Sequence, residues 1–109
     1  MDDVITELII VITTVPNQAI AQEIAKTLVE EKYAACVQVL PSLTSTYIWE
    51  SKLCVESEQL LLIKTLGDRY QALETKLRSI HPYSEPEIIA ISAVAASKTY
   101  EQWVAKSLT

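Results

Sequence analysis

Glycine is nearly absent from this sequence. It occurs once, at Gly67, where an average usage of roughly 7% would give about eight residues in a chain of 109. Dinucleotide-binding fingerprints, phosphate loops and nucleophile elbows each need several glycines, because their backbones turn sharply or approach the ligand closely. The sequence therefore excludes these three kinds of site.

Histidine and cysteine are also scarce. His81 is the only histidine, and the two cysteines, Cys36 and Cys54, lie eighteen positions apart. One imidazole excludes a metal site that takes several histidines from one chain. The cysteine spacing fits neither a CxxC pair nor a disulfide framework, so both side chains are expected to be free thiols.

Positive charge is low as well. Nine basic residues stand against fourteen acidic ones, which leaves a formal net charge of -5. Nucleic acid and anionic membranes are therefore not expected as partners. The N-terminus is acidic where a secretory signal needs positive charge, and no apolar run approaches the roughly 20 residues that span a bilayer. We expect a cytoplasmic protein.

The hydrophobic pattern predicts a single domain over residues 1–109 with α+β structure. Strands are expected at 7–13, 35–40 (closed by Pro41 and continuing extended at 44–49), 52–65 and 87–91, and helices at 18–31, from 67–68 to 80, and after Ser97 or Thr99. Gly67-Asp68 is expected to cap the second helix, and residues 50–52 to form a hairpin tip. Two strand-helix-strand units with right-handed crossovers give a four-stranded antiparallel sheet with both helices on one face, the ferredoxin-like βαββαβ sandwich.

This fold leaves one face of the sheet without helices. The strands at 7–13 and 52–65 are apolar on both sides, and the second is too long for a small sheet. Strand length beyond the sheet must pair with another chain or remain an open edge. Tyr47, Trp49 and Trp103 fit the same interpretation, although aromatic side chains can also form a ligand platform. We therefore expect a homo-oligomer.

The densest group of reactive side chains is the segment HPYSEPE at 81–87. His81 could act as a general base or a metal ligand, with Glu85 or Glu87 supplying an oxygen. The alternative is a stiff connection with a hydrogen-bonded histidine. A hydrolase would need His81 beside Ser84 or Cys36 and an acid, and no sequence pattern places these groups together.

Cys36 and Lys64 are the other candidates for chemistry. Cys36 is either a packed core thiol or a metal ligand, because thiolate, imidazole and carboxylate together suit copper or zinc. It could join His81 only if the fold or an oligomer interface brings the two together. Lys64 is a charged residue within an apolar run, so its ammonium group is expected to reach a carboxylate or the mouth of a pocket.

Five motifs in order give the chain a specific resemblance. They are TTVPN at 13–17, AACV at 34–37, TSTYIWE at 44–50, LLIKT at 61–65, and HPY at 81–83 with PEI at 86–88. Together they resemble the CutA divalent-cation-tolerance family. The resemblance implies a tight homotrimer, similar to PII signalling proteins, in which long hairpin arms complete sheets across subunits. It also implies a role in tolerance of copper and other divalent metals.

Three positions depart from the family pattern. Members thought to bind copper carry Cys where Thr13 stands and His where Ile80 stands, beside the shared His81. The resemblance therefore argues against a high-affinity copper site of that kind, while a weaker or interface site at His81 stays open. Ser51 replaces the usual glycine of the hairpin tip, which argues against a turn with positive φ there.

These observations predict a very stable, non-enzymatic homotrimer for divalent-metal tolerance that requires no cofactor. His81 and Cys36 are the candidate ligands for copper or another divalent cation. Trp49, Lys64, Tyr83 and Glu87 are the candidates for a cleft between subunits. The alternative is a PII-like regulatory module that binds a small anionic metabolite at that cleft and signals to a protein partner, although few basic residues are available to bind phosphate.

Overall fold

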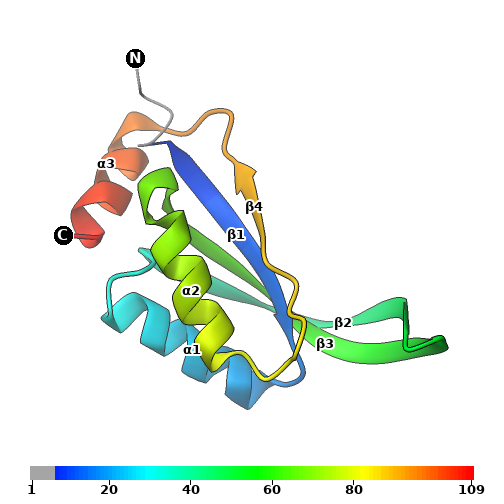
Figure 1. Ribbon diagram of the computed structural model, residues 1–109. Coiled ribbons are helices and arrows are strands. Elements are labelled where there is room, and N and C mark those ends of the chain that lie inside the picture. Colours follow the sequence, from blue (N-terminus) through cyan, green and yellow to red (C-terminus); the bar gives the residue numbers. More distant parts are fainter. Residues whose placement is uncertain (1–6) are drawn as a thin grey trace.

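Four strands form one antiparallel sheet in the order β2-β3-β1-β4 (Figure 1). The computed structural model describes residues 7–109. The strands are β1 (Leu8–Val15), β2 (Cys36–Trp49), β3 (Lys52–Leu66) and β4 (Ile89–Ser92), and the helices are α1 (Gln18–Glu30), α2 (Tyr70–Ile80) and α3 (Lys98–Ser107). The predicted ferredoxin-like sandwich is confirmed by this order.

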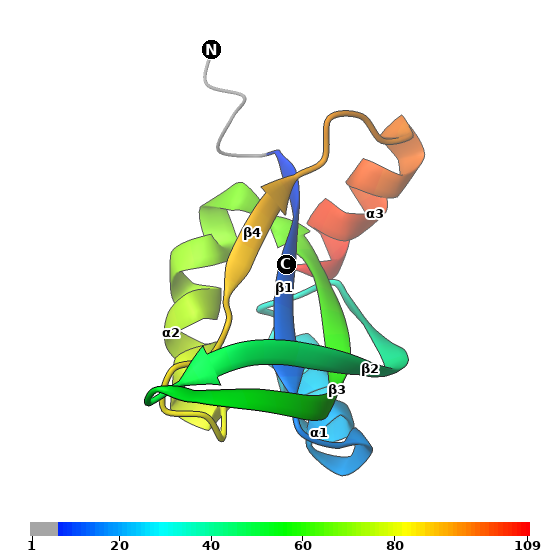
Figure 2. The same cartoon turned by 90° about the vertical axis from the view of Figure 1, so that its right-hand side faces the viewer.

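Helices α1 and α2 cover one face of the sheet, as predicted (Figures 1 and 2). The core between them is fully buried and aliphatic, with Leu61 and Ile63 of β3 packed against Leu28, Leu73 and Leu77 of the helices. Side chains alternate along a strand, so every second residue of β1 and β3 faces this core. The other residues face away from α1 and α2.

Helix α3 packs on the opposite face, at one end of the sheet. Leu8 and Leu66 stand opposite each other in register there, and Val104 and Leu108 of α3 belong to the same cluster. The N-terminus of α3 is capped by Ser97, whose hydroxyl accepts the Tyr100 N–H at 3.2 Å. Of the two caps expected from the sequence, Ser97 is the one used.

Strands β2 and β3 extend beyond the sheet as a two-stranded hairpin arm, which comprises residues 43–58 (Figures 1 and 2). The arm makes the molecule elongated, with principal extents of 46 × 26 × 23 Å. One side of the arm carries Ile48, Leu53 and Val55, which are all more than half exposed. Within residues 7–109 no helix or strand covers this side.

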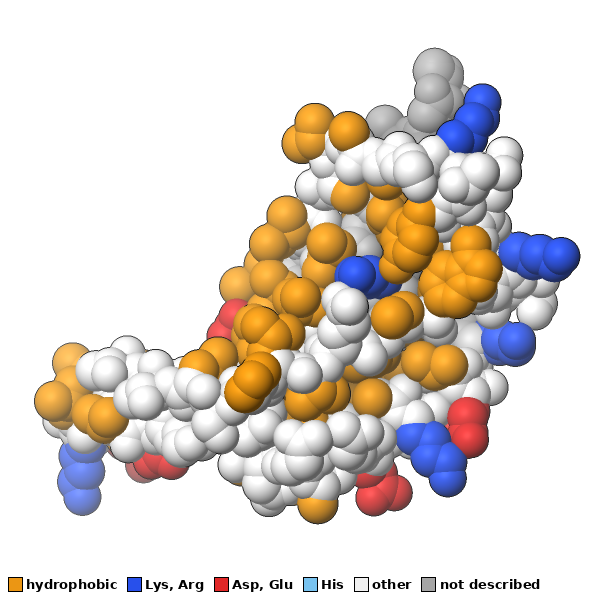
Figure 3. Space-filling model, turned by 180° about the vertical axis from the view of Figure 1, so that it is seen from behind, with side chains coloured by type: hydrophobic (Ala, Val, Ile, Leu, Met, Phe, Trp, Pro, Cys, Tyr) orange, Lys and Arg blue, Asp and Glu red, His pale blue; other side chains and the backbone are white. Residues whose placement is uncertain are grey.

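The uncovered face of the sheet is apolar as well. Ile10 and Ile12 of β1 stand opposite Ile91 and Ile89 of β4, and those two β4 side chains are about half exposed. Figure 3 shows hydrophobic side chains gathered over this face and along the arm. We call this surface, with the apolar side of the arm, the bare face. Within residues 7–109, no helix is both long and apolar enough to cross a bilayer.

Two predicted strand boundaries are wrong. Pro41 does not end the second strand, because β2 runs on through an irregularity between Leu40 and Leu43. A bulge of this kind accommodates a proline, which has no N–H to donate to the ladder. The fourth strand begins at Ile89 rather than at residue 87, since Pro86 and the residues around it form no ladder.

Two predicted details of turns are also wrong. Asp68 does not cap the second helix, because residues Gly67–Arg69 form a 3₁₀ turn and no side chain caps α2. The hairpin tip does adopt positive φ, at Glu50 (51°) and Ser51 (67°). A two-residue turn with positive φ at both positions matches the twist of the flanking strands, and here the strands impose it without a glycine.

Candidate functional site

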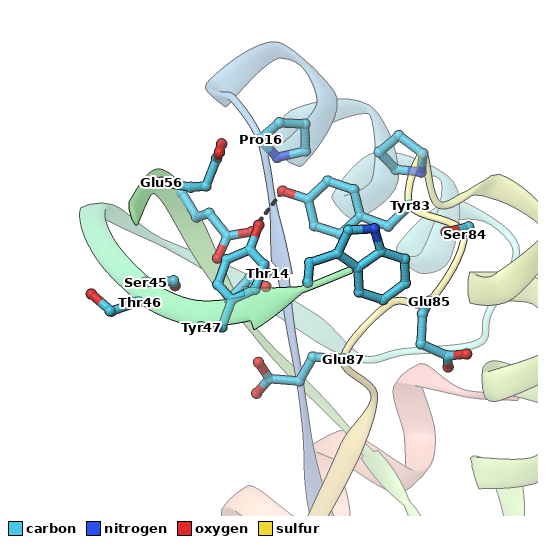
Figure 4. Close-up of a pocket in the computed structure, with 13 residues that line it drawn as sticks. Thr14, Pro16, Ser45, Thr46, Tyr47, Glu56, Tyr83, Ser84, Glu85 and Glu87 are labelled. Atoms are coloured by element: carbon cyan, nitrogen blue, oxygen red, sulfur yellow. Dashed lines mark hydrogen bonds between the residues drawn. The ribbon is translucent and has the colours of Figure 1, made fainter. Parts of the chain in front are cut away.

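A pocket of about 790 Å³ lies between the hairpin arm and the segment 82–87 (Figure 4). One wall is formed by residues of the arm: Ser45, Thr46, Tyr47, Trp49, Glu56 and Glu58. The opposite wall is formed by Pro82, Tyr83, Ser84, Glu85 and Glu87, and Thr14 and Pro16 line the pocket near the end of β1. The two prolines Pro82 and Pro86 keep the second wall extended. The site therefore combines a rigid connection with a two-stranded arm.

The pocket is lined by carboxylates and aromatic rings. Tyr47 and Trp49 of β2 share a side of the arm with Glu56 and Glu58 of β3, because the register pairs Tyr47 with Cys54 and Ser45 with Glu56. The segment 82–87 adds Tyr83, Glu85 and Glu87. No lysine, arginine or histidine is among the lining residues. The pocket is therefore acidic and aromatic.

Glu58 and Tyr83 join the two walls of the pocket. The Tyr83 hydroxyl donates a hydrogen bond to Oε2 of Glu58 at 2.6 Å, and Glu58 is only 5% exposed. Burial raises the pKa of Tyr83 first of all, and the hydrogen bond to the Glu58 carboxylate raises it further. The phenol therefore remains a donor well above neutral pH.

His81 lies behind this pair and is held by the end of β1. Its Nδ1 accepts the Tyr83 N–H at 3.2 Å, which assigns the ring proton to Nε2. Nε2 donates to the Thr14 carbonyl at 3.0 Å and lies 3.1 Å from the Thr13 hydroxyl. Burial lowers the pKa of His81, although the Thr14 hydrogen bond and nearby Glu58 oppose that shift. His81 is thus a neutral imidazole with both nitrogens engaged.

The structure separates the predicted site residues into two groups. Trp49, Tyr83 and Glu87 line the pocket, and His81 adjoins it through its bond with Tyr83. Cys36 and Lys64 are not among the lining residues, and they stand opposite each other on β2 and β3.

Lys64 has a different neighbour from the one expected. Its Nζ lies 5.8 Å from the centroid of the Tyr100 ring, a cation–π contact, and in residues 7–109 it makes no ion pair with a carboxylate. Tyr100 in turn stacks on Trp103 at 5.7 Å between centroids. Lys64 therefore belongs to the contact between the sheet and α3.

One chain does not provide a metal centre in the part that the structure describes. No three His, Cys, Asp or Glu groups of residues 7–109 lie close enough together to hold a metal ion. Cys36 pairs with Lys64, which aligns with Ile10 of β1, whereas His81 contacts Thr13 and Thr14 further along that strand. Cys36 and His81 therefore do not meet within one chain.

A hydrolytic arrangement is likewise not formed. The hydrogen-bond partners of the His81 ring are Thr13, Thr14 and Tyr83, and within the described residues neither Ser84 nor Cys36 bonds to it. The geometry fits the alternative given for the segment 81–87, which is a stiff connection with a hydrogen-bonded histidine.

Glu56 and Glu58 are the site residues that sequence reasoning missed. Glu58 bonds Tyr83, which is 25 residues away in the chain, so no local motif joins the two. One signal was available: the two glutamates are spaced two apart in an overlong strand, which places both on one side.

Three kinds of comparison relate the chain to known proteins. The family model described as "CutA1 divalent ion tolerance protein" matches residues 9–107. The Divalent-cation tolerance protein CutA of Thermus thermophilus is 40% identical over 95 residues, which are 87% of this chain and 92% of that protein. The human Protein CutA is 43% identical over 91 residues, 84% of this chain. The chain spans about half, 51%, of the length of the human protein.

A solved structure gives the same result for the fold. The crystal structure of CutA from Xylella fastidiosa superposes with a TM-score of 0.92 at 35% sequence identity, and the match covers 95% of this chain and all of that one. The similarity therefore includes the hairpin arm and the segment that forms the pocket.

Proposed function

The chain is a member of the CutA1 divalent ion tolerance protein family, and from this premise we propose that it acts as a homotrimer in cellular tolerance to divalent metal ions such as copper. The observation that carries the proposal is the family match over residues 9–107, nearly the whole chain. The names of the relatives describe ion tolerance rather than a reaction, and we propose a stable, non-enzymatic protein of the cytoplasm.

The bare face supports assembly. A monomer would leave the apolar sheet face around Ile89 and Ile91 in water, together with Ile48, Leu53 and Val55 of the arm. Contiguous apolar surfaces of this kind are typical of protein interfaces. A closed oligomer buries the sheet faces against one another and gives the arms neighbouring strands to pair with.

A metal site shared between subunits is consistent with the separation of the ligands within one chain. Cys36 alternates with Val37, which packs towards α1 and α2, so its thiol is directed to the bare face. His81 binds a metal through Nδ1 only after giving up the Tyr83 N–H. We therefore propose a site of modest affinity, with Cys36 and His81 contributed by different subunits.

The alternative function is a PII-like regulatory module, and the pocket is the observation that favours it. The pocket has the volume of a small-molecule site and lies on the arm that would contact a neighbouring subunit. An anionic metabolite does not suit it, because the lining contains four glutamates and no basic side chain.

Calorimetric titration with Cu(II), Cu(I) and Zn(II) tests the metal proposal. The His81→Ala and Cys36→Ala variants are compared with a Cys54→Ala control, after light scattering has shown that all keep the same oligomer. Binding at fixed stoichiometry that weakens about tenfold, roughly 1.4 kcal/mol, in the first two variants alone would support the shared site. Binding that is indifferent to both substitutions would overturn it.

A further inference from the structure

We propose that Lys64 aligns the subunits: in the assembled oligomer its ammonium group pairs with the carboxylate of Glu87 from a second copy of the chain. The inference rests on the homo-oligomer proposed above, and it adds the polar contact that fixes how two copies meet. Its evidence is the position of Lys64 on the uncovered face of the sheet and the position of Glu87 at the other end of that face.

Lys64 lies on the side of the sheet that faces away from α1 and α2. Ile63, the residue before it in β3, packs in the core beneath these helices, so Lys64 points to the opposite side. The register places Lys64 between Cys36 of β2 and Ile10 of β1, and Ile10 in turn lies opposite Ile91 of β4. Lys64 therefore belongs to a row of side chains that crosses the bare face.

Lys64 is the only charged side chain on this face in the part of the four-stranded sheet that the structure describes. By the same alternation and register, the other strand positions on the face carry no charge: Leu8, Ile10, Ile12 and Thr14 of β1, Cys36, Gln38 and Leu40 of β2, Leu60, Leu62 and Leu66 of β3, and Ile89 and Ile91 of β4. Figure 3 shows a basic side chain surrounded by hydrophobic ones on this face.

The ammonium group of Lys64 has no carboxylate against it within residues 7–109. Its Nζ lies 5.8 Å from the centroid of the Tyr100 ring, and the side chain is already half-buried in one chain. When a second copy covers the sheet, this charge is removed from water. A buried charge is costly unless a charge of opposite sign pairs with it. The covering surface is therefore expected to supply a carboxylate.

Glu87 is the carboxylate that the uncovered face offers. Ile88 packs against the core beneath α1 and α2, so Glu87 and Ile89 on either side of it point to the uncovered face. Glu87 is exposed, and within the described residues it makes no ion pair. Figure 4 shows its carboxylate directed away from that of Glu85. It continues the row of Ile89 and is available to a neighbouring sheet.

Lys64 and Glu87 are too far apart to pair within one chain. Lys64 aligns with Ile91 through Ile10, and Glu87 precedes Ile91 by four residues, about 13 Å of extended chain. β1 lies between β3 and β4, which adds about 10 Å across the sheet. The uncovered face thus carries a positive charge at one end, a negative charge at the other, and apolar side chains between them.

This polarity suits a closed ring of copies. In a trimer each copy offers Lys64 to one neighbour and Glu87 to the other, so that all contacts are equivalent. Opposite charges at the two ends favour one alignment of the faces, and like charges disfavour the wrong ones. The same alignment brings Cys36, which pairs with Lys64 in the sheet, towards the neighbour's segment 81–87, as the proposed metal site requires.

Exchange of the two charges in the full-length protein tests the pair. Lys64→Glu and Glu87→Lys should each raise the concentration at which the oligomer dissociates by about tenfold or more, because like charges then meet at every contact. The combined variant should recover most of this loss. Sedimentation velocity over a dilution series measures the dissociation, in a fixed concentration of urea that partly dissociates the wild type.

Neutral variants keep the test decisive if a reversed charge prevents folding. Lys64→Met and Glu87→Gln each leave one charge without its partner, so the double variant should lose much less than the sum of the two single losses. Glu23→Lys is the matched control. It lies at an exposed position of α1, changes the net charge as Glu87→Lys does, and should leave the dissociation unchanged.

Three results would overturn the pair while leaving the homo-oligomer in place. They are a combined charge-exchange variant that assembles no better than the single variants, additive losses in the neutral variants, and an equal loss in Glu23→Lys. A wild-type protein that is monomeric at every concentration would instead overturn the homo-oligomer itself. Failure of the pair and failure of the proposed assembly are therefore distinguishable.

Discussion

The hydroxyl of Tyr83 donates a 2.6 Å hydrogen bond to Oε2 of Glu58, which lies 25 residues earlier in the chain. This bond connects the segment after α2 to the base of the hairpin arm. The neighbouring N–H of Tyr83 bonds His81, which is itself fixed to Thr14. One residue thereby couples the position of the arm to the end of β1.

Tyr83→Phe should destabilise the protein by about 1–3 kcal/mol, because it leaves a buried carboxylate without its donor. Chemical denaturation at a fixed protein concentration measures the change in the free energy of unfolding. Tyr33→Phe is the matched control: within the described residues the Tyr33 hydroxyl has no hydrogen-bond partner, so its loss should cost less than about 0.5 kcal/mol. Equal effects of the two variants would contradict the role of the bond.

The same bond predicts the behaviour of the protein in base. The pKa of Tyr83 is raised above its ordinary value by burial and by Glu58, so the folded state holds this proton more tightly than the unfolded chain. The contribution of Tyr83 to stability should therefore decrease as the pH rises above about 10. Ultraviolet titration of the phenols should show that the tyrosine that ionises last in the folded wild type is absent in Tyr83→Phe. If Tyr83→Phe instead removed a tyrosine that ionises near pH 10, the ordinary value, the assignment would be contradicted.

His81 predicts a change of stability in acid. Burial lowers its folded pKa, so between about pH 6.5 and that lower value the unfolded chain binds more protons. Stability contributed by the neutral imidazole is present above about pH 6.5 and is lost as the pH falls through the folded pKa. His81 is the only histidine, so its NMR titration is directly assignable. A midpoint at or above about 6.5 would contradict the prediction.

Ser51→Gly should stabilise the hairpin arm. Ser51 has φ of 67°, a left-handed conformation that costs a residue with a Cβ roughly 1 kcal/mol and costs glycine little. Thermal unfolding should show a gain of about 0.5–1 kcal/mol. Ser57→Gly, at a paired position of β3, is the control and should lose about that amount. A loss in both variants would mean that the tip conformation is not strained.

The sequence predicts the helices and strands of the fold better than the turns and bulges that connect or interrupt them. The hydrophobic spacing of Leu73 and Leu77 predicts the helix that carries them, because burial of one helix face leaves a repeat in the chain. The bulge near Pro41 and the left-handed tip at Ser51 depend on pairing with β3, which is a tertiary constraint. The hydrophobic pattern of either strand alone does not predict how the two strands pair.

The residues of the candidate site likewise include some that the sequence predicts and some that it does not. Trp49, Tyr83 and Glu87 could be selected from the sequence, because rare or reactive side chains attract notice individually. Glu58 could not, since an acidic residue in a strand is ordinary until the structure places Tyr83 against it. Cys36 and His81 were linked by ligand chemistry alone, and the topology keeps them apart within one chain.

A charge on the bare face should disrupt assembly. Ile91 is 49% exposed on β4, and Ile91→Glu would place a carboxylate in the proposed contact between subunits. Sedimentation analysis should show a smaller species. Val29→Glu, at a position 39% exposed on α1, is the control and should keep the wild-type mass. A wild-type mass for Ile91→Glu would mean that this part of the sheet lies outside the interface.

The most direct test of the account is the molar mass of the wild-type protein in solution, measured by light scattering over a range of concentrations. The proposed trimer predicts a species of about three times the chain mass of 12.2 kDa that persists on dilution. A species of a single chain mass would contradict the account, because the bare face would then be in water and no second subunit would bring Cys36 to His81.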